Sequence, residues 1–326
     1  MMVLCKATRT VLLVVCALVL GACGLDVTFE SSDRNRDLIA EFDPEGDDNE
    51  PEPDAEPDPD EEEPEVVSPP LDDHLVWDGL ARNFLQGSCF DYDALGRSIE
   101  GRDLLSLYLD QLFRQDLSSI DSRADRVALW VNAYNAITVF GVTGARDANP
   151  DFRVDDGGFE FFRNAQWDVG GMRLSLDQIE HGILRGDAQH DSVTSITDPE
   201  VLAQIAAEAE AVAPFDPRLH FAINCASRSC PDLRPGAYTG KDLELQLAEQ
   251  TERFLMDPTK GAGPNGISAL FDWFRQDFEA VAPVGELIEM WRPGGLDGVA
   301  VDTYLQYDWA PNDVDAALEA CQPEAE

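Results

Sequence analysis

The segment from Glu41 to Glu65 contains fifteen carboxylates, six prolines and no basic residue. Like charges repel one another and proline interrupts both helices and sheets, so this segment cannot collapse onto a hydrophobic core. We therefore expect residues 23–73 to form a disordered acidic tether, residues 74–321 a single globular domain, and residues 322–326 a short tail. An acidic interaction tail, for example one that binds calcium, is the alternative interpretation of the segment.

The N-terminus has the pattern of an export signal. Two basic residues, Lys6 and Arg9, precede an apolar run from Val11 to Leu20 that is too short for a permanent membrane span. The following Leu20-Gly21-Ala22-Cys23 resembles the lipobox of bacterial lipoproteins. This resemblance implies that residues 1–22 are a signal peptide and that Cys23 is acylated, which anchors the chain to a lipid membrane. An ordinary signal peptide cleaved nearby is the alternative.

The expected location is therefore the cell envelope, with the chain anchored to the outer or inner membrane and facing the periplasm or the exterior. The formal net charge is −41, and the chain remains acidic without the tether. Nucleic acids are polyanions, so this charge argues against a nucleic-acid partner.

Hydrophobic periodicity predicts an α+β domain in which helices pack on a small, mainly antiparallel sheet. Residues 123–142 have a period near 3.6, and residues 167–174 alternate around a Gly170-Gly171 turn, as in a β-hairpin. A short helix should follow, with a capping box of Ser175 and Gln178 and a C-terminal cap at Gly186. Further helices are expected at 201–213, 241–257 and 267–281, and a strand at 218–224.

Five ordered blocks together resemble one protein family: ALWVNAYNAITVFGV, LSLDQIEHGILRG, DPRLHFAINCASRSCPDLR, LFDWFRQDF and YLQYDWAPND. The family is the one named domain of unknown function 547, and the resemblance implies little about activity because that function is not established. The order of a core helix and a later histidine is also loosely similar to papain-like and transglutaminase-like folds. In those folds the nucleophile is on the early helix, where this chain has asparagines and no cysteine.

Four cysteines remain after Cys5 and Cys16 leave with the signal peptide and Cys23 is acylated. An even number of cysteines in an oxidising compartment favours disulfides. Proximity in the sequence predicts one bond between Cys225 and Cys230, which leaves Cys89 to pair with Cys321.

A catalytic thiol is the rival interpretation of the same cysteines. Such a thiol needs a base within hydrogen-bonding reach, and His181 and His220 are the candidates. In a strand at 218–224, His220 and Asn224 would point to one face and Cys225 to the other. Cys230 avoids this objection because the intervening loop can fold back.

Polar side chains on two predicted helices add further candidate site residues. Asp177, His181 and Arg185 are spaced four apart, with Glu180 on the neighbouring flank, so they form either a catalytic histidine with its orienting aspartate or a surface row of salt bridges. Asn132 and Asn135 lie beside a buried stripe. They should hold a neighbouring loop or, less favoured, orient an active-site histidine.

A zinc site built from His220, Cys225 and Cys230 with His181 or Glu180 is disfavoured. The ligands are separated by four residues instead of the two that are common in structural zinc sites, and an oxidising compartment competes for the thiols. No metal and no other cofactor is therefore predicted.

Two functions remain. The favoured one is a non-enzymatic binding or scaffolding domain that the disulfide between Cys225 and Cys230 stabilises. It would bind an unidentified protein or peptide in a groove lined by His181, Arg185 and His220. The alternative is a hydrolase or acyl transferase that uses Cys230 or Cys225 as its nucleophile, a histidine as its base and Asp177 as the orienting group.

Overall fold

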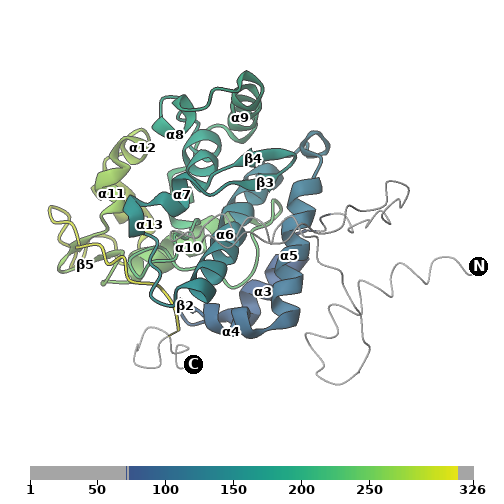
Figure 1. The fold of residues 1–326 in the computed structure, drawn as a ribbon. Coiled ribbons are helices and arrows are strands. Elements are labelled where there is room, and N and C mark those ends of the chain that lie inside the picture. The colour runs from purple at the N-terminus through teal and green to yellow at the C-terminus, as the bar shows by residue number, and fades with distance from the viewer. Residues whose placement is uncertain (1–70, 72, 315–326) are drawn as a thin grey trace, which may run out of the picture.

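A computed structural model describes residue 71 and residues 73–314 of the chain (Figure 1). The predicted signal peptide, nearly all of the predicted tether, and Cys23 and Cys321 lie outside these residues, so the predictions about them stay predictions.

The described residues form many helices and three short antiparallel hairpins, which confirms the α+β class. The strands make three separate two-stranded sheets: β1 (Leu85–Gln86) with β2 (Cys89–Phe90), β3 (Trp167–Val169) with β4 (Met172–Leu174), and β5 (Ala262–Gly263) with β6 (Gly266–Ile267). The helices are α3 (Leu75–Phe84), α4 (Tyr92–Arg97), α5 (Ile99–Arg114), α6 (Arg123–Ala148), α7 (Glu160–Arg163), α8 (Asp191–Thr194), α9 (Pro199–Val212), α10 (Leu243–Met256), α11 (Leu270–Trp273), α12 (Arg275–Glu279) and α13 (Val284–Trp291), with the 3₁₀ turns η1 (Leu117–Ser119), η2 (Asp156–Gly158) and η4 (Pro217–Phe221) and the π-helix η3 (Gln178–Leu184).

Helix α6 is the central element of the fold. The side chain of Ser122 caps its N-terminus by accepting a hydrogen bond from the Asp125 amide, and α4, α5, α9 and η3 all pack against it. The helix is long and apolar enough to cross a membrane, but its most apolar 18-residue window is 100% buried inside the fold. It is therefore the core helix of the domain, and it lacks the polar outer face that a helix on the protein surface would have.

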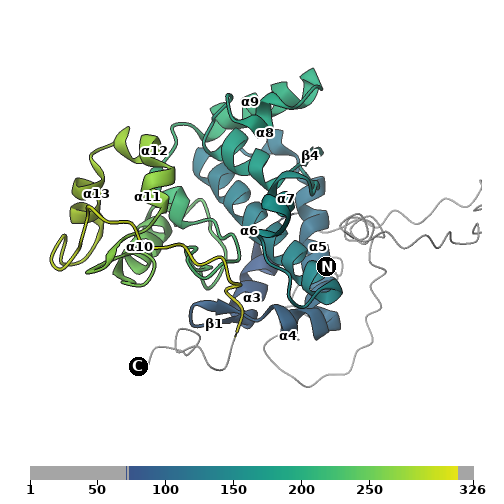
Figure 2. The ribbon, with the colours of Figure 1, turned by 60° about the vertical axis from the view of Figure 1, so that its left-hand side comes forward.

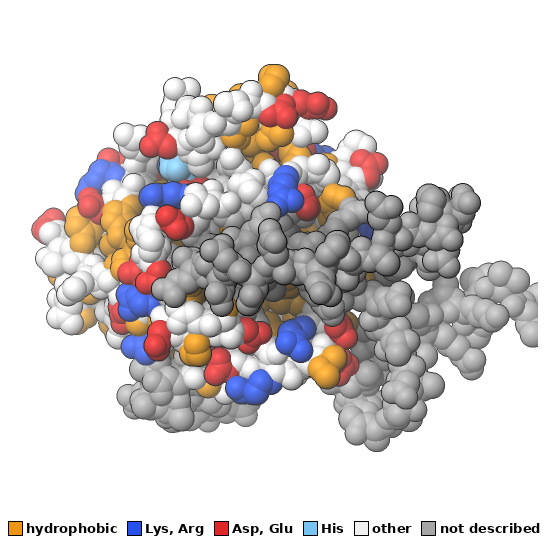
Figure 3. All heavy atoms as spheres, in the orientation of Figure 1, with side chains coloured by type: hydrophobic (Ala, Val, Ile, Leu, Met, Phe, Trp, Pro, Cys, Tyr) orange, Lys and Arg blue, Asp and Glu red, His pale blue; other side chains and the backbone are white. Residues whose placement is uncertain are grey.

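The buried side chains form two hydrophobic clusters. The larger one surrounds α6, and the smaller one joins α10 to α13 with Phe221 of η4. Figure 2 shows the two groups side by side, with α10–α13 on the left and α3–α9 on the right. On the face shown in Figure 3, acidic and basic side chains are interspersed over the described surface.

Several local predictions are confirmed. Trp167 pairs with Leu174 across the hairpin, and Gly170 and Gly171 take positive φ angles of 58° and 78° in its turn. The capping box also forms, because the Ser175 amide donates to Gln178 Oε1 at 2.8 Å and the Gln178 amide donates to Ser175 Oγ at 3.2 Å.

Two predicted elements are wrong. Residues 218–224 do not form a strand, because Pro217 follows Asp216, whose side chain accepts a hydrogen bond from the Arg218 amide at 3.0 Å. This cap and proline start a 3₁₀ turn. The helix expected at 267–281 is divided into α11 and α12 at Phe274, whose φ and ψ of −108° and 26° are not helical.

The last described segment, residues 303–314, links the two hydrophobic clusters, and we call it the C-terminal strap. Its Thr303 carbonyl accepts a hydrogen bond from Ile267 beside the smaller cluster, and its Asn312 carbonyl accepts one from Phe90 of β2. In Figure 2 this yellow segment crosses from the α10–α13 group to β1.

Two asparagines of α6 hold neighbouring backbone with both ends of their amide groups. Asn132 Nδ2 donates to the Tyr238 carbonyl at 2.7 Å, and its Oδ1 accepts from the Tyr238 amide at 2.9 Å. Asn135 Nδ2 donates to the Ala222 carbonyl at 2.9 Å, and its Oδ1 accepts from the Asn224 amide at 2.8 Å. Each side chain therefore replaces a backbone partner in fixing a loop to the core helix.

Replacement of Asn132 by alanine should lower the free energy of unfolding by about 3 kcal/mol, because the buried amide and carbonyl of Tyr238 would lose their partners. Urea denaturation followed by circular dichroism measures this change. Gln204→Ala on the exposed side of α9 is the matched control and should stay within about 0.5 kcal/mol of the parent. An equal effect of the two substitutions would contradict the role given to Asn132.

Candidate functional site

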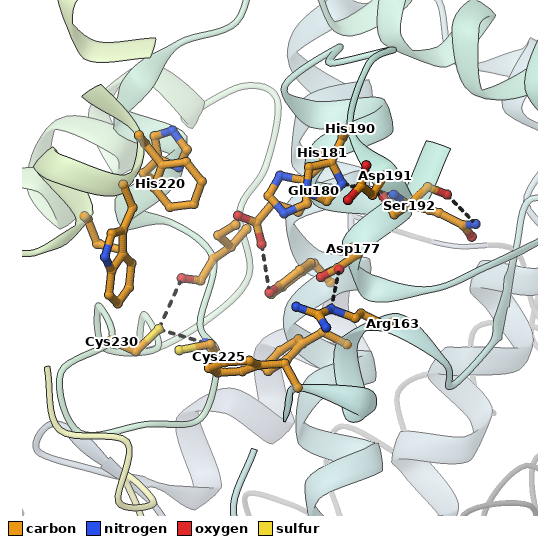
Figure 4. Close-up of a pocket in the computed structure, with 18 of the residues that line it drawn as sticks. Arg163, Asp177, Glu180, His181, His190, Asp191, Ser192, His220, Cys225 and Cys230 are labelled. Carbon is orange, nitrogen blue, oxygen red and sulfur yellow. Dashed lines mark hydrogen bonds and ion pairs between the residues drawn. The ribbon is translucent and has the colours of Figure 1, made fainter. Parts of the chain in front are cut away.

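A cavity of about 550 Å³ lies between the two hydrophobic clusters (Figure 4). The chain has four histidines, and three of them, His181, His190 and His220, line this cavity. The lining also includes both described free cysteines, three acidic residues, one arginine and several aromatic residues: Cys225, Cys230, Asp177, Glu180, Asp191, Arg163, Tyr134, Phe159, Phe162, Phe274, Trp273, Tyr307 and Trp309.

Asparagine side chains fix the loop that carries the two cysteines, residues 225–230, which we call the cysteine loop. Asn135 holds the chain just before it, as described above. Asn224 then closes the loop, because its Nδ2 donates to the Pro231 carbonyl at 2.6 Å and its Oδ1 accepts from the Ala226 amide at 2.8 Å. Ala226 is held in the left-handed region at φ 59°, a conformation that costs energy for any residue with a Cβ and that clusters at functional sites.

The predicted disulfide between Cys225 and Cys230 is wrong, because both cysteines are free thiols. The Sγ of Cys230 accepts a hydrogen bond from the backbone amide of Cys225 at 2.8 Å, so it faces the backbone of its neighbour. The other predicted pair has Cys89 buried beside the strap, but Cys321 lies outside the described residues, and that bond stays a prediction.

The two thiols differ in acidity. The Sγ of Cys225 lies 3.2 Å from Ser227 Oγ and 3.3 Å from the Tyr307 hydroxyl. Burial alone would raise the pKa of Cys225, but hydrogen bonds from Cys230, Ser227 and Tyr307 outweigh it and bring the pKa below its ordinary value. Burial and the neighbouring Cys225 raise the pKa of Cys230 well above the ordinary value. Cys225 is thus the better candidate for a thiolate.

His220 enters the cavity from η4, and it lines the same cavity as Cys225 because the strand that would have separated them does not form. Its Nε2 lies 2.8 Å from Asp277 Oδ2, and its ring stacks on Phe274 at 4.0 Å. Burial lowers the pKa of His220, and the bond to Asp277 offsets only part of this effect. Burial opposes ionisation of Asp277 as well, but bonds from His220 and Arg185 bring its pKa down to about 2.

The charge states of these groups define the tautomer of His220. An ionised carboxylate only accepts hydrogen bonds, so the neutral imidazole must carry its proton on Nε2 and donate it to Asp277. The Nδ1 lone pair of His220 is then available as a proton acceptor.

His181 comes from the π-helix η3, a type of helix often found at functional sites. Arg185 Nη1 donates to His181 Nδ1 at 2.7 Å, and the same guanidinium forms an ion pair with Asp277 at 2.7 Å. The His181 ring stacks on His190 at 3.7 Å. Burial, followed by His190 and Arg185, lowers the pKa of His181 to about 3, so the imidazole is neutral with its proton on Nε2.

Asp177 does not take the predicted position beside His181. Within residues 73–314 it makes no hydrogen bond to His181, and its carboxylate faces Arg163 at 3.9 Å. Burial and the nearby Glu180 raise the pKa of Asp177 to about 6. Glu180 accepts a hydrogen bond from the Tyr134 hydroxyl at 3.1 Å, and burial raises its pKa as well.

The sequence interpretation missed Asp277, Tyr307, His190 and Tyr134 as members of the site. Asp277 and Tyr307 lie in two of the blocks that carried the family resemblance, and His190 is one of only four histidines. These features of the sequence could have marked the three residues as candidate site residues. For the zinc alternative, no group of three histidine, cysteine or acidic side chains in the described part of the chain is arranged to hold a metal ion.

The NMR signals of His181 should not titrate between pH 5 and pH 8, because its pKa of about 3 keeps the ring neutral throughout this range. Recording the imidazole carbon and proton shifts as a function of pH tests this prediction, with His181→Gln used to assign the signal. A midpoint near the ordinary histidine pKa would show that burial, His190 and Arg185 do not act on the ring as described.

Replacement of Tyr307 by phenylalanine should raise the pKa of Cys225, because it removes a hydroxyl that hydrogen-bonds the sulfur while it keeps the aromatic ring. Alkylation of Cys225 by iodoacetamide, mapped by mass spectrometry from pH 5 to pH 10, should shift to higher pH. Tyr304→Phe in the same strap is the control, since that hydroxyl bonds Arg275 instead. Identical profiles for the parent and Tyr307→Phe would refute this assignment.

Comparison with known proteins gives one match. The family model described as "Protein of unknown function, DUF547" matches residues 117–255, which include α6, η3 and the cysteine loop. No curated protein and no solved structure matches the chain. The matched region contains both described free cysteines and all three cavity histidines, and it ends before Asp277 and Tyr307. The predicted resemblance to the DUF547 family is therefore confirmed for residues 117–255.

Proposed function

We propose that the cavity is the active site of a hydrolase or acyl transferase in which Cys225 is the nucleophile. The observation that carries this proposal is the free Cys225 thiol, which lines the cavity and has a lowered pKa because Cys230, Ser227 and Tyr307 hydrogen-bond its sulfur. A thiolate is the reactive form of cysteine, and reactive cysteines are partly accessible in environments of this kind. The scaffolding hypothesis relied on a 225–230 disulfide, so the free thiols favour the enzyme.

The reaction proceeds through a thioester. The Cys225 thiolate attacks the carbonyl carbon of an ester or amide, and the alcohol or amine departs with a proton. Water or a second acceptor then attacks the thioester and releases the thiolate. The leaving group takes its proton from water, because His181 is a neutral imidazole whose Nε2–H can donate a hydrogen bond but not a proton. His220 has a free Nδ1 lone pair that can accept a proton from the attacking water and then release it to solvent. Asp277 orients His220, which is the role first assigned to Asp177.

No hydrogen bond within residues 73–314 joins either histidine to the Cys225 sulfur. In this proposal the thiolate is therefore stabilised by hydroxyl donors before substrate arrives, and the histidines act on the substrate and on water.

The same proposal includes the location of the enzyme. We infer that the domain is held at a membrane of the cell envelope through acylated Cys23, where it meets protein or peptide substrates. The lipobox-like sequence and the acidic tether support this location, and no nucleic-acid partner is included because the chain is strongly acidic.

A p-nitrophenyl acetate assay tests the nucleophile. The parent protein should release p-nitrophenol and carry one acetyl group on Cys225, detected by peptide mass spectrometry after acid quench. Cys225→Ala should lose the acetylation and reduce turnover to the uncatalysed rate. Cys230→Ala is the matched control and should keep acetylation at Cys225, with its pH dependence moved to higher pH because one hydrogen bond to that sulfur is lost. Acetylation at Cys230 instead, or full turnover by Cys225→Ala, would overturn the proposal.

A further inference from the structure

The charged residues of the cavity are unbalanced. Three acidic residues, Asp177, Glu180 and Asp191, line it together with one arginine, Arg163. His181 adds no positive charge, because it is held neutral by burial and by its neighbours. The cavity therefore favours a cationic occupant over an anionic one.

Asp177 and Glu180 lack a strong cationic partner of their own. In the part of the chain that the structure describes, the Asp177 carboxylate accepts no hydrogen bond, and its ion pair with Arg163 is long at 3.9 Å. The Arg163 side chain is 60% exposed, so solvent weakens that pair further. Arg185, the other nearby guanidinium, is committed to Asp277 and His181. A carboxylate withdrawn from water without a partner is costly, and a bound cation would remove that cost.

An aromatic cluster forms a second wall of the same cavity. The rings of Trp273 and Trp309 stack with an interplanar angle of 9°, and Tyr307 packs on Trp309 with ring centroids 4.3 Å apart. Tyr307 also contacts the Cys225 sulfur, so this wall begins at the nucleophile. Aromatic faces attract alkylammonium groups, and carboxylates add to that attraction.

Figure 4 shows how these walls are arranged. Asp177, the N-cap residue of η3, and Glu180 within η3 lie on one side of the cavity, and Cys225 and Cys230 come from the cysteine loop on the other. A group bound to the carboxylates would thus lie within the cavity that the thiol also reaches.

We propose that the substrate carries a protonated primary amine, of the kind found at a peptide N-terminus or on a lysine side chain, which binds between the Asp177 and Glu180 carboxylates and the aromatic wall. This inference rests on the proposed function, because it assigns the substrate class to the site at which Cys225 reacts.

Charged methanethiosulfonate reagents test this inference on the full chain. In each reaction the Cys225 thiolate attacks the divalent sulfur of the reagent, forms a mixed disulfide with it and expels methanesulfinate. The 2-aminoethyl reagent supplies the ammonium group, the methyl reagent is neutral and the 2-sulfonatoethyl reagent is anionic. Rates at Cys225 are measured by mass spectrometry at 0.3 M salt, which screens the distant charges of the chain, and are divided by the rates for free 2-mercaptoethanol.

The expected ratio of cationic to anionic rates is about tenfold above that of the free thiol, which corresponds to about 1.4 kcal/mol. Asp177→Asn and Glu180→Gln should each lower the ratio, and Arg163→Gln should raise it by removing the competing cation. Glu252→Gln, an exposed position on α10, is the matched control and should leave the ratio unchanged. Circular dichroism checks that each variant is folded.

The outcomes separate this inference from the proposed function. A reactive Cys225 with the charge preference of the free thiol would overturn the substrate class and leave the nucleophile intact. The cation preference could also remain unchanged in Asp177→Asn, in Glu180→Gln and in Arg163→Gln. The overall charge of the chain would then be its cause, and the inference would be overturned as well. A Cys225 that reacts with none of the three reagents would overturn the proposed function itself.

Discussion

The paired hydrogen bonds between Asn135 and the backbone of residues 222–224 are the contact on which the rest of the site depends. This amide is buried inside the core helix, where leaving a polar group without a partner costs about 1–3 kcal/mol. The loop must therefore meet the helix in one register that satisfies both ends of the side chain. Asn224, whose amide is held there, then uses its own side chain to close the cysteine loop. Cys225 owes its position to two successive amide side chains.

The charged cluster around Arg185 performs a related task between the two hydrophobic clusters. Its guanidinium comes from the end of η3, and it bonds Asp277 of α12 as well as His181. Asp277 in turn bonds His220. The cluster joins both sides of the cavity through ionic contacts, and only the carboxylate and guanidinium in it are charged. Two neutral imidazoles, each with its proton on Nε2, are thereby held within one small volume. The Nδ1 of His181 accepts a hydrogen bond from Arg185, whereas the Nδ1 of His220 is free to accept a proton.

The elements determined by short-range patterns could be predicted from the sequence. Helix α6, the β3–β4 hairpin and the Ser175–Gln178 capping box each depend on residues close together in the chain. The strand at 218–224 failed because alternation of apolar residues was given more weight than the Asp216-Pro217 helix start. The Cys225–Cys230 bond failed because spacing cannot show where each sulfur points. Asp277 and Tyr307 reach the site from segments that are distant in sequence, so only the folded chain reveals their contacts with His220 and Cys225.

The C-terminal strap gives the site an order of assembly. The cysteine loop can be fixed by α6 once residues 123–231 are present, but one of the hydroxyls that contact the Cys225 sulfur belongs to Tyr307, close to the end of the described chain. The strap is held at one end by β6, at the other by β2, and along its length by the cysteine loop itself. A chain still emerging from the ribosome or a translocation channel would thus carry a Cys225 sulfur that lacks one of its hydrogen-bond partners. That contact forms only when the last part of the fold closes over the first.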